Sequence, residues 1–191
     1  MRTILMATLA AAAVVICGFA PSASAAGDAK SEIEALERKC ADAPTVDQLM
    51  NCYETSGDLV VYDLSTPREY DGQQAVRADF QNFFDSMKNP KVEFVSMHVV
   101  TDGKMALANS VQHFTATDKS GKPVDMTFRV TDVWQKQKGD WKIIHTHVSF
   151  PIDMATGKVA NQLEQFSVTK DGKPFDAVDF NFWGKIGRAH V

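Results

Sequence analysis

Two histidines, His145 and His147, stand two residues apart in a run of alternating side chains. On a β-strand this spacing puts both imidazoles on one face, where zinc-binding strands present them. A zinc site also needs a third protein ligand, and His113 is the only obvious candidate. We interpret the three histidines as hydrogen-bonded structural groups and predict neither a metal nor any other cofactor.

The N-terminus has the pattern of an export signal. A short cationic start is followed by an apolar run over 4–20 and by the small-residue pattern Ala23-x-Ala25. A membrane anchor is disfavoured because the run is rich in alanine and is followed by helix breakers. A lipoprotein site at Cys17 is disfavoured because Ile16 is too large for the position before it. We predict a signal peptide over residues 1–25 and a periplasmic or secreted protein.

Two cysteines, Cys40 and Cys52, remain after the predicted leader. An even pair in an oxidising compartment favours a disulfide. The alternative is two buried thiols on amphipathic helices, which cysteine tolerates well. Because we predict export, we favour the disulfide.

The composition excludes several classes of function. The chain has 191 residues, 45% of them hydrophobic and 23% charged, which is typical of one globular domain. It carries 20 Lys and Arg against 24 Asp and Glu, without a basic run. Phosphate backbones and anionic membranes bind clustered cations, so we expect no nucleic acid as partner and no membrane after signal cleavage.

The C-terminal end divides into two segments. The last six residues, 186–191, resemble the in-frame translation of a sequencing adapter, and we expect them to be a non-native tail. Residues 152–185 have weak patterns and are assigned to a C-terminal extension. The domain itself is predicted over 26–151.

Helical patterns come first along the chain and strand patterns follow. Helices are predicted from a capping box at Ser31-x-x-Glu34, from a cap at Thr45, and from Asp71 to the stop at Asn89-Pro90, with a short strand over 59–62. The period then changes to two, and predicted turns separate four strands over 92–100, 105–117, 124–137 and 141–150. This order predicts an α+β fold with helices on one face of a bent sheet.

Three segments carry a family resemblance: Val61-Tyr62-Asp63-Leu64 with Pro67 and Gly72, the run 129–134, and the run 139–149. They resemble a SnoaL-like domain of the nuclear-transport-factor-2-like superfamily, which includes ketosteroid isomerases and the association domain of calcium/calmodulin-dependent kinase. The resemblance implies a cone-shaped, strongly curved antiparallel sheet wrapped on N-terminal helices (a cystatin-like α+β barrel). It also implies an internal pocket and a homodimer formed through the outer sheet face. Members of one fold differ widely in function.

The resemblance places Asp132 in the cavity, and strand parity then assigns its neighbours. The expected outer face carries Trp141, Ile143, His145 and His147, with Trp141 and both histidines at or near the dimer interface. The inner set is mostly apolar and suits a hydrophobic or aromatic small molecule. The expected ligand-binding residues are Tyr53, Phe80, Ser110, Gln112, Phe114, Phe128, Val130, Trp134, Ile144, Thr146 and Val148.

The resemblance also implies two catalytic carboxyl groups. Asp63 matches the general base of ketosteroid isomerases, and Asp132 matches the acid that an apolar site keeps protonated to stabilise an enolate. The first-helix tyrosine of those enzymes has no counterpart in the run 35–39, and Tyr53 of the neighbouring helix is a candidate to supply the hydroxyl. We therefore predict an exported small-molecule protein with acid–base chemistry on a carbonyl compound. The alternative is a non-catalytic module for ligand binding or dimerisation.

Overall fold

The three-dimensional structure is a computed structural model. It describes residues 23–55, 57–154, 156–161, 169–170 and 173–174. The C-terminal tail over 186–191 and nearly all of the expected signal peptide lie outside these described residues. Within the described part of the chain, no helix combines the length and the hydrophobicity needed to cross a membrane.

Three helices precede the long strands: α1 (Ala23–Ala41), α2 (Val46–Met50) and α3 (Gly72–Ser86). The cap of α2 is confirmed, since the side chain of Thr45 accepts a hydrogen bond from the backbone N–H of Gln48. The predicted start of α1 at Ser31 is wrong, because α1 already includes the Ala-rich residues before it. Alanine has the highest helix propensity, so the helix extends beyond the capping-box pattern.

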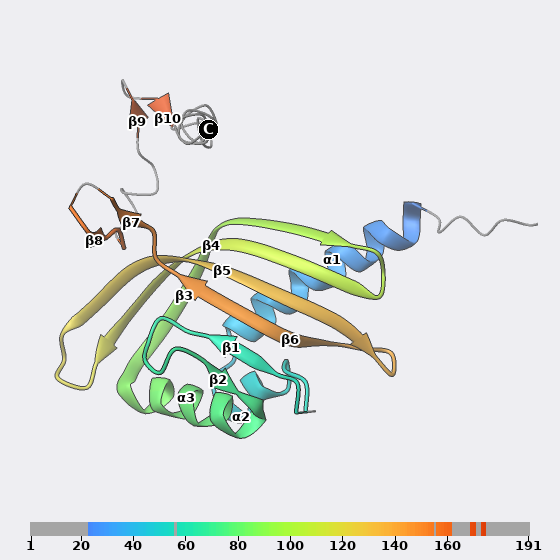
Figure 1. The fold of residues 1–191 in the computed structure, drawn as a ribbon, viewed down its shortest axis with the longest axis horizontal. Helices are drawn as coiled ribbons and strands as arrows, with labels where there is room; N and C mark the ends of the chain where they lie inside the picture. The colour runs from blue at the N-terminus through green and yellow to red at the C-terminus, as the bar shows by residue number, and fades with distance from the viewer. Residues whose placement is uncertain (1–22, 56, 155, 162–168, 171–172, 175–191) are drawn as a thin grey trace, which may run out of the picture.

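The main sheet has six strands in the order β2-β1-β6-β5-β4-β3 (Figure 1). They are β1 (Val60–Tyr62), β2 (Tyr70–Asp71), β3 (Met87–Thr101), β4 (Met105–Asp118), β5 (Pro123–Gln137) and β6 (Asp140–Ser149). The α+β class with helices against a curved sheet is confirmed, and the sheet does not close into a full barrel. Four more strands form two separate two-stranded ribbons: β7 (Ile152–Asp153) with β8 (Lys158–Val159), and β9 (Thr169–Lys170) with β10 (Lys173–Pro174).

The sheet is antiparallel except at one pair. β1 runs parallel to β6, with Tyr62 opposite His147. The sequence pattern did not predict this pair, because a three-residue strand has too few side chains to indicate its direction. The parallel pair brings the end of β1, and therefore Asp63, to the edge of the concave face.

Helix α1 crosses the long strands, while α2 and α3 lie together near β1 and β2 (Figure 1). The core lies between these helices and the concave face of the sheet. Its completely buried members include Ile33 of α1, Val76 of α3 and Trp134 of β5. The helices cover this face only in part, and the uncovered part forms the cavity described below.

A β-bulge at Ile144 changes the parity of β6. Val133 pairs with His145, whereas the next residue, Trp134, pairs with Ile143, so Ile144 is an extra residue without a partner on β5. Residues before the bulge therefore face the opposite side from the one that simple alternation predicts. Trp141 and Ile143 are buried on the concave side, and their predicted place on the outer face is wrong. Ile144 is only half-buried and does not line the cavity.

The predicted disulfide is present between Cys40, in the last turn of α1, and Cys52, just after α2. After Cys52 the chain follows β6 for one residue, with Tyr53 bridged in parallel to Ile143. Two backbone hydrogen bonds hold this segment: Ile143 N–H donates to the Cys52 carbonyl at 2.8 Å, and Glu54 N–H donates to the Ile143 carbonyl at 3.0 Å. The disulfide therefore joins the end of α1 to a segment that is fixed on the sheet.

Candidate active site

A cavity of about 460 Å³ lies between the concave face of the sheet, α1 and α3. Its wall is mainly apolar and includes Tyr53 and five phenylalanines. Four carboxylic acids also line it: Glu37 from α1, Asp63 after β1, Asp79 from α3 and Asp132 from β5. The phenylalanines are Phe80, Phe83 and Phe84 of α3, Phe114 of β4 and Phe128 of β5.

Most of the residues predicted to line the cavity do so. Both predicted catalytic residues, Asp63 and Asp132, are in its wall. Strand parity assigned the correct face of the sheet to the predicted residues of β4 and β5. On β6 it was correct for the residues that follow the bulge, Thr146 and Val148. The predicted ligand-binding residues in the wall are Tyr53, Phe80, Gln112, Phe114, Phe128, Val130, Thr146 and Val148.

Three predicted wall residues lie elsewhere. Ile144 is displaced by the bulge, and Ile143 lines the cavity in its place. Trp134 is on the concave face, but α1 covers it completely and it lines a second hollow beside Trp141. Ser110 is buried beside Gln112, whose amide donates to its hydroxyl at 2.9 Å, and it does not reach the cavity. Parity assigns a face of the sheet, but it does not say which part of that face a helix covers.

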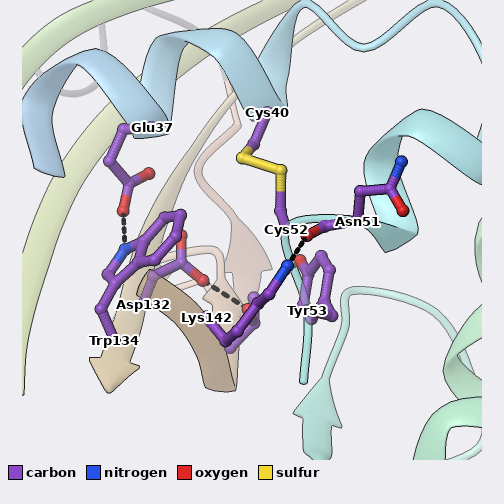
Figure 2. Close-up of a disulfide and its surroundings, with 9 residues drawn as sticks. Glu37, Cys40, Asn51, Cys52, Tyr53, Asp132, Trp134 and Lys142 are labelled. Atoms are coloured by element: carbon purple, nitrogen blue, oxygen red, sulfur yellow. Dashed lines mark hydrogen bonds between the residues drawn. A yellow bond between two sulfur atoms is a disulfide. The ribbon is translucent and has the colours of Figure 1, made fainter. Parts of the chain in front are cut away.

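The two acids nearest α1 belong to one buried hydrogen-bond network (Figure 2). The indole N–H of Trp134 donates to Glu37 Oε1 at 2.6 Å, and the carboxyl group of Glu37 is hydrogen-bonded to Asp132. Thr146 Oγ1 donates to Asp132 Oδ1. Because that hydroxyl has a single hydrogen, Thr146 must accept from the Tyr53 hydroxyl, which lies 3.3 Å away.

Burial favours a retained proton on the Glu37–Asp132 pair. Burial, together with the neighbouring charge of Asp132, raises the pKa of Glu37 to about 9. Burial also raises the pKa of Asp132, but hydrogen bonds from Thr146 and Glu37 oppose the rise and the pKa is about 6. Glu37 has the higher pKa of the two and therefore the stronger tendency to keep a proton at neutral pH. Burial raises the pKa of Asp132 in the direction that the resemblance implies, but the sequence analysis did not predict Glu37 as its partner.

The disulfide fixes the geometry of this network (Figure 2). Cys40 lies about one helical turn after Glu37, and Cys52 directly precedes Tyr53. Lys142 Nζ donates to the backbone carbonyl of Asn51 at 2.5 Å and holds the same segment against β6. The covalent bond therefore sets the position of the helix that carries Glu37 relative to the segment that carries Tyr53.

The other two acids form a second pair. Asp63 accepts a hydrogen bond from the backbone N–H of Leu64 at 2.7 Å, and its carboxyl group is also hydrogen-bonded to that of Asp79. Burial raises the pKa of Asp63 to about 6, and the neighbouring Asp79 adds to the rise while the N–H of Leu64 opposes it. Asp79 is 7% exposed, and its Oδ2 atom is buried without a hydrogen-bond partner. Asp63 is half-buried and ionised at neutral pH.

Sequence reasoning missed Glu37 and Asp79. Both interrupt an apolar helical face: Glu37 lies between Ile33 and Cys40 at helical spacing, and Asp79 follows Val76 by three residues. A carboxyl group in such a stripe is a signal, because burial of a charge is unfavourable unless a partner or a proton compensates it. Neither residue lies on the strands to which the parity argument was applied.

The histidines take part in local contacts. His113 Nε2 lies 3.0 Å from Asp125 Oδ1, and His145 Nδ1 lies 2.9 Å from the Val60 carbonyl. The ring of Tyr62 meets both His145 and His147 edge-on. Within the described ranges, no three His, Cys, Asp or Glu side chains are grouped so that they could hold a metal ion.

The fold and this cavity define the class of protein. A family model described as a SnoaL-like domain matches residues 34–153, and the chain belongs to that family. This confirms the resemblance found in the sequence. Among curated proteins, none matches the chain.

Solved structures with the same fold include a nuclear transport factor 2-like protein of unknown function from Pseudomonas putida KT2440. It is 25% identical, with a TM-score of 0.62, and the match covers 72% of this chain and 96% of that one. A ketosteroid isomerase-like protein from Erwinia carotovora atroseptica is 18% identical, with a TM-score of 0.54 and coverages of 63% and 94%. A protein with a cystatin-like fold from Caulobacter vibrioides is 18% identical, with a TM-score of 0.55 and coverages of 67% and 94%.

The pKa of Glu37 predicts a pH dependence of stability. A carboxyl group whose pKa is higher in the folded than in the unfolded protein stabilises the fold at low pH, and this contribution decreases as pH rises from about 4.5 to about 9. The decrease is at most about 1.4 kcal/mol per pH unit. Glu37→Gln cannot ionise, so the stability of this variant relative to wild type should increase with pH across the window. Urea unfolding followed by tryptophan fluorescence at pH 5, 7 and 9 measures it.

The matched control is Glu34→Gln on the same helix, since the side chain of Glu34 is 39% exposed and forms a surface ion pair with Lys30. This variant should keep the wild-type pH dependence. If wild type and Glu37→Gln lose stability in parallel between pH 5 and 9, Glu37 does not hold the proton of the network.

Proposed function

We propose that the cavity binds a small, largely apolar carbonyl compound and catalyses proton transfer on it, as an isomerase does. The observation that supports this most is the presence of two carboxyl pairs with different environments in one apolar cavity. Asp63 with Asp79 supplies a carboxylate at the half-buried end of β1, and Glu37 with Asp132 retains a proton deep under α1. Enolisation needs such a division between a base and a hydrogen-bond donor.

Asp63 is the base in this proposal. A base works best when its pKa lies near the working pH, and burial brings the pKa of Asp63 to about 6. Its carboxylate removes a proton from the carbon next to the carbonyl group, and the electron pair moves into an enolate. The same carboxyl group then returns the proton to a carbon of the enolate, so the base is regenerated and the substrate is isomerised.

Tyr53 and Glu37 serve the developing oxyanion. Tyr53 is buried in the wall of the cavity, and its hydroxyl donates to Thr146 when no ligand is bound. A substrate oxygen can take this hydrogen bond, while neutral Glu37 keeps the rest of the network in place. The likeness to a ketosteroid isomerase-like protein supports this chemistry at the level of the fold.

Binding without catalysis is the second candidate, and one observation favours it. The donors nearest Asp132 are already engaged, because Tyr53 donates to Thr146, Thr146 to Asp132, and Glu37 to Asp132. A substrate oxygen must displace one of these hydrogen bonds before it is stabilised. A cavity that only binds an apolar molecule needs no such exchange.

Proton exchange tests the catalytic proposal. Wild type should exchange the α-protons of 2-tetralone, or of a β,γ-unsaturated ketosteroid, for deuterium in D2O, as measured by proton NMR. Asp63→Asn should lower the rate about 100-fold or more, because a positioned general base contributes roughly that factor. The rate should increase as pH rises through about 6, where Asp63 loses its proton.

The control is Asp58→Asn, since Asp58 is exposed and does not line the cavity. This variant should exchange protons at the wild-type rate. The absence of exchange in wild type, or wild-type exchange by Asp63→Asn, would leave ligand binding as the function of the cavity.

We also propose that the protein is exported and acts in the periplasm or outside the cell. The export pattern over residues 1–25 and the Cys40–Cys52 disulfide support this location. Protein expressed from the full chain and recovered from the periplasm should begin at Ala26. Its intact mass should increase by two hydrogen atoms on reduction. An uncleaved leader, or two free thiols in the recovered protein, would contradict the proposal.

The outer face of the sheet is our candidate for a homodimer interface. A row of residues crosses it from Val100 through Leu107 and Val133 to His145. Val100 is 55% exposed and Leu107 38% exposed, and a second copy would cover these apolar side chains. Among the described residues after β6, Asn161 lies at the edge of β5, where its carbonyl accepts a hydrogen bond from Thr127 N–H at 2.7 Å.

Light scattering at micromolar concentration should report a dimer for wild type. Leu107→Arg should yield a monomer, because it places a charge in the middle of the apolar row. Met154→Arg is the matched control, since Met154 is 90% exposed and lies outside that row. A wild-type monomer, or a dimer that persists in Leu107→Arg, would exclude this interface.

A further inference from the structure

The charged groups in the cavity wall are all of one sign. Four carboxylic acids line it, and among the described lining residues none is lysine, arginine or histidine. Arg77 of α3 pairs with Asp47 at the surface, and Arg38 of α1 lies over the ring of Phe94. The cavity therefore contains carboxylates without a protein cation to balance them.

Asp79 has one carboxylate oxygen without a partner, whereas its other oxygen, Oδ1, accepts a hydrogen bond from the Ser65 hydroxyl at 3.5 Å. It is 7% exposed and lines the cavity, and its Oδ2 atom is buried without a hydrogen bond. A buried carboxylate oxygen without a donor is strongly unfavourable, since it has lost its water and gained nothing in return. The adjacent carboxyl group of Asp63 adds a like charge when both are ionised. A ligand with positively charged hydrogen-bond donors would supply the missing hydrogen bond of Asp79 Oδ2 and balance the like charges of the two carboxylates.

The surroundings of Asp79 suit an organic cation. Phe80 and Phe83 follow Asp79 on α3 and also line the cavity. Phe80 packs against Tyr53 with ring centroids 5.2 Å apart, and Phe83 packs against Phe114 at 5.6 Å. Aromatic faces attract ammonium groups and also pack against an apolar body. Ca²⁺ or Mg²⁺ would instead need six or more oxygen ligands from protein or water, which an aromatic wall does not supply.

We propose that the ligand of this cavity carries a protonated amine, whose N–H groups bind Asp79 Oδ2 while an aromatic or aliphatic body packs against the phenylalanines. This names the ligand class of the proposed site and rests on the proposed binding in the cavity, but not on turnover. The ammonium supplies the donors that Asp79 lacks. A neutral molecule of the same shape supplies none, and an anion is repelled by the ionised carboxylates of the cavity.

Three indole probes of similar shape and different charge test the proposal: tryptamine, tryptophol and indole-3-acetate. Isothermal titration calorimetry at pH 7.5 should show that tryptamine binds at least about tenfold more tightly than tryptophol, as expected for charge-assisted hydrogen bonds to buried carboxylates. Indole-3-acetate should bind more weakly than both.

Asp79→Asn should remove most of the preference for tryptamine over tryptophol and leave tryptophol affinity nearly unchanged. Asp85→Asn is the matched control, because Asp85 is exposed on the same helix and its side chain bonds only Gln81. It should keep the wild-type preference. The comparison of the three probes on wild type stands on its own if Asp79→Asn does not fold.

The proposal is overturned if tryptophol or indole-3-acetate binds as tightly as tryptamine, if none of the three binds up to 10 mM, or if folded Asp79→Asn keeps the preference. Its failure is distinguishable from failure of the catalytic proposal, which is measured by proton exchange on neutral ketones. Exchange without a preference for amines refutes the amine ligand alone, and a preference for amines without exchange refutes catalysis alone.

Discussion

The hydrogen bond from the Trp134 indole to Glu37 joins helix α1 to the sheet at its most deeply buried point. A carboxyl group at this buried position must either stay neutral or have a partner. Glu37 meets both conditions, because burial raises its pKa and its carboxyl group is hydrogen-bonded to Asp132. The rest of the cavity follows from this contact. Thr146 donates a hydrogen bond to Asp132. The Cys40–Cys52 disulfide fixes Tyr53 relative to α1, so that the Tyr53 hydroxyl lies within hydrogen-bond distance of Thr146.

The two carboxyl pairs differ because their surroundings differ. The pair under α1 is surrounded by donors with fixed directions, and each hydrogen in it has one acceptor. The pair at the end of β1 has two donors, the Leu64 N–H to Asp63 and the Ser65 hydroxyl to Asp79 Oδ1, and Asp79 Oδ2 has no donor. The first pair is complete without a ligand, whereas the second is not. Asp63 and Asp79 therefore give the most direct indication of which chemical groups a ligand of this cavity carries.

Much of the fold follows from local signals in the sequence. The turns at Gly103 and Gly139 need positive φ angles, which glycine adopts freely, and they separate the long strands as predicted. Most of the strand residues that parity assigned to the cavity do lie in its wall. Parity failed at Ile144, because a bulge inserts one residue without any local signal in the sequence, and at Trp134, because the path of α1 is a tertiary feature. Glu37 was missed since its partner, Asp132, is 95 residues away in the chain.

Between β1, which pairs in parallel with β6, and β2, an exposed segment supplies part of the cavity wall. The chain leaves β1 at Asp63 and returns as β2 at Tyr70, and the exposed residues between them include Leu64 and Ser65, which line the cavity. Tyr70 closes this segment by donating to the Thr66 carbonyl at 3.0 Å. None of its residues contributes to the core or to the acids under α1. For protein engineering, this segment is a suitable place for a combinatorial library that varies selectivity while the scaffold keeps its stability.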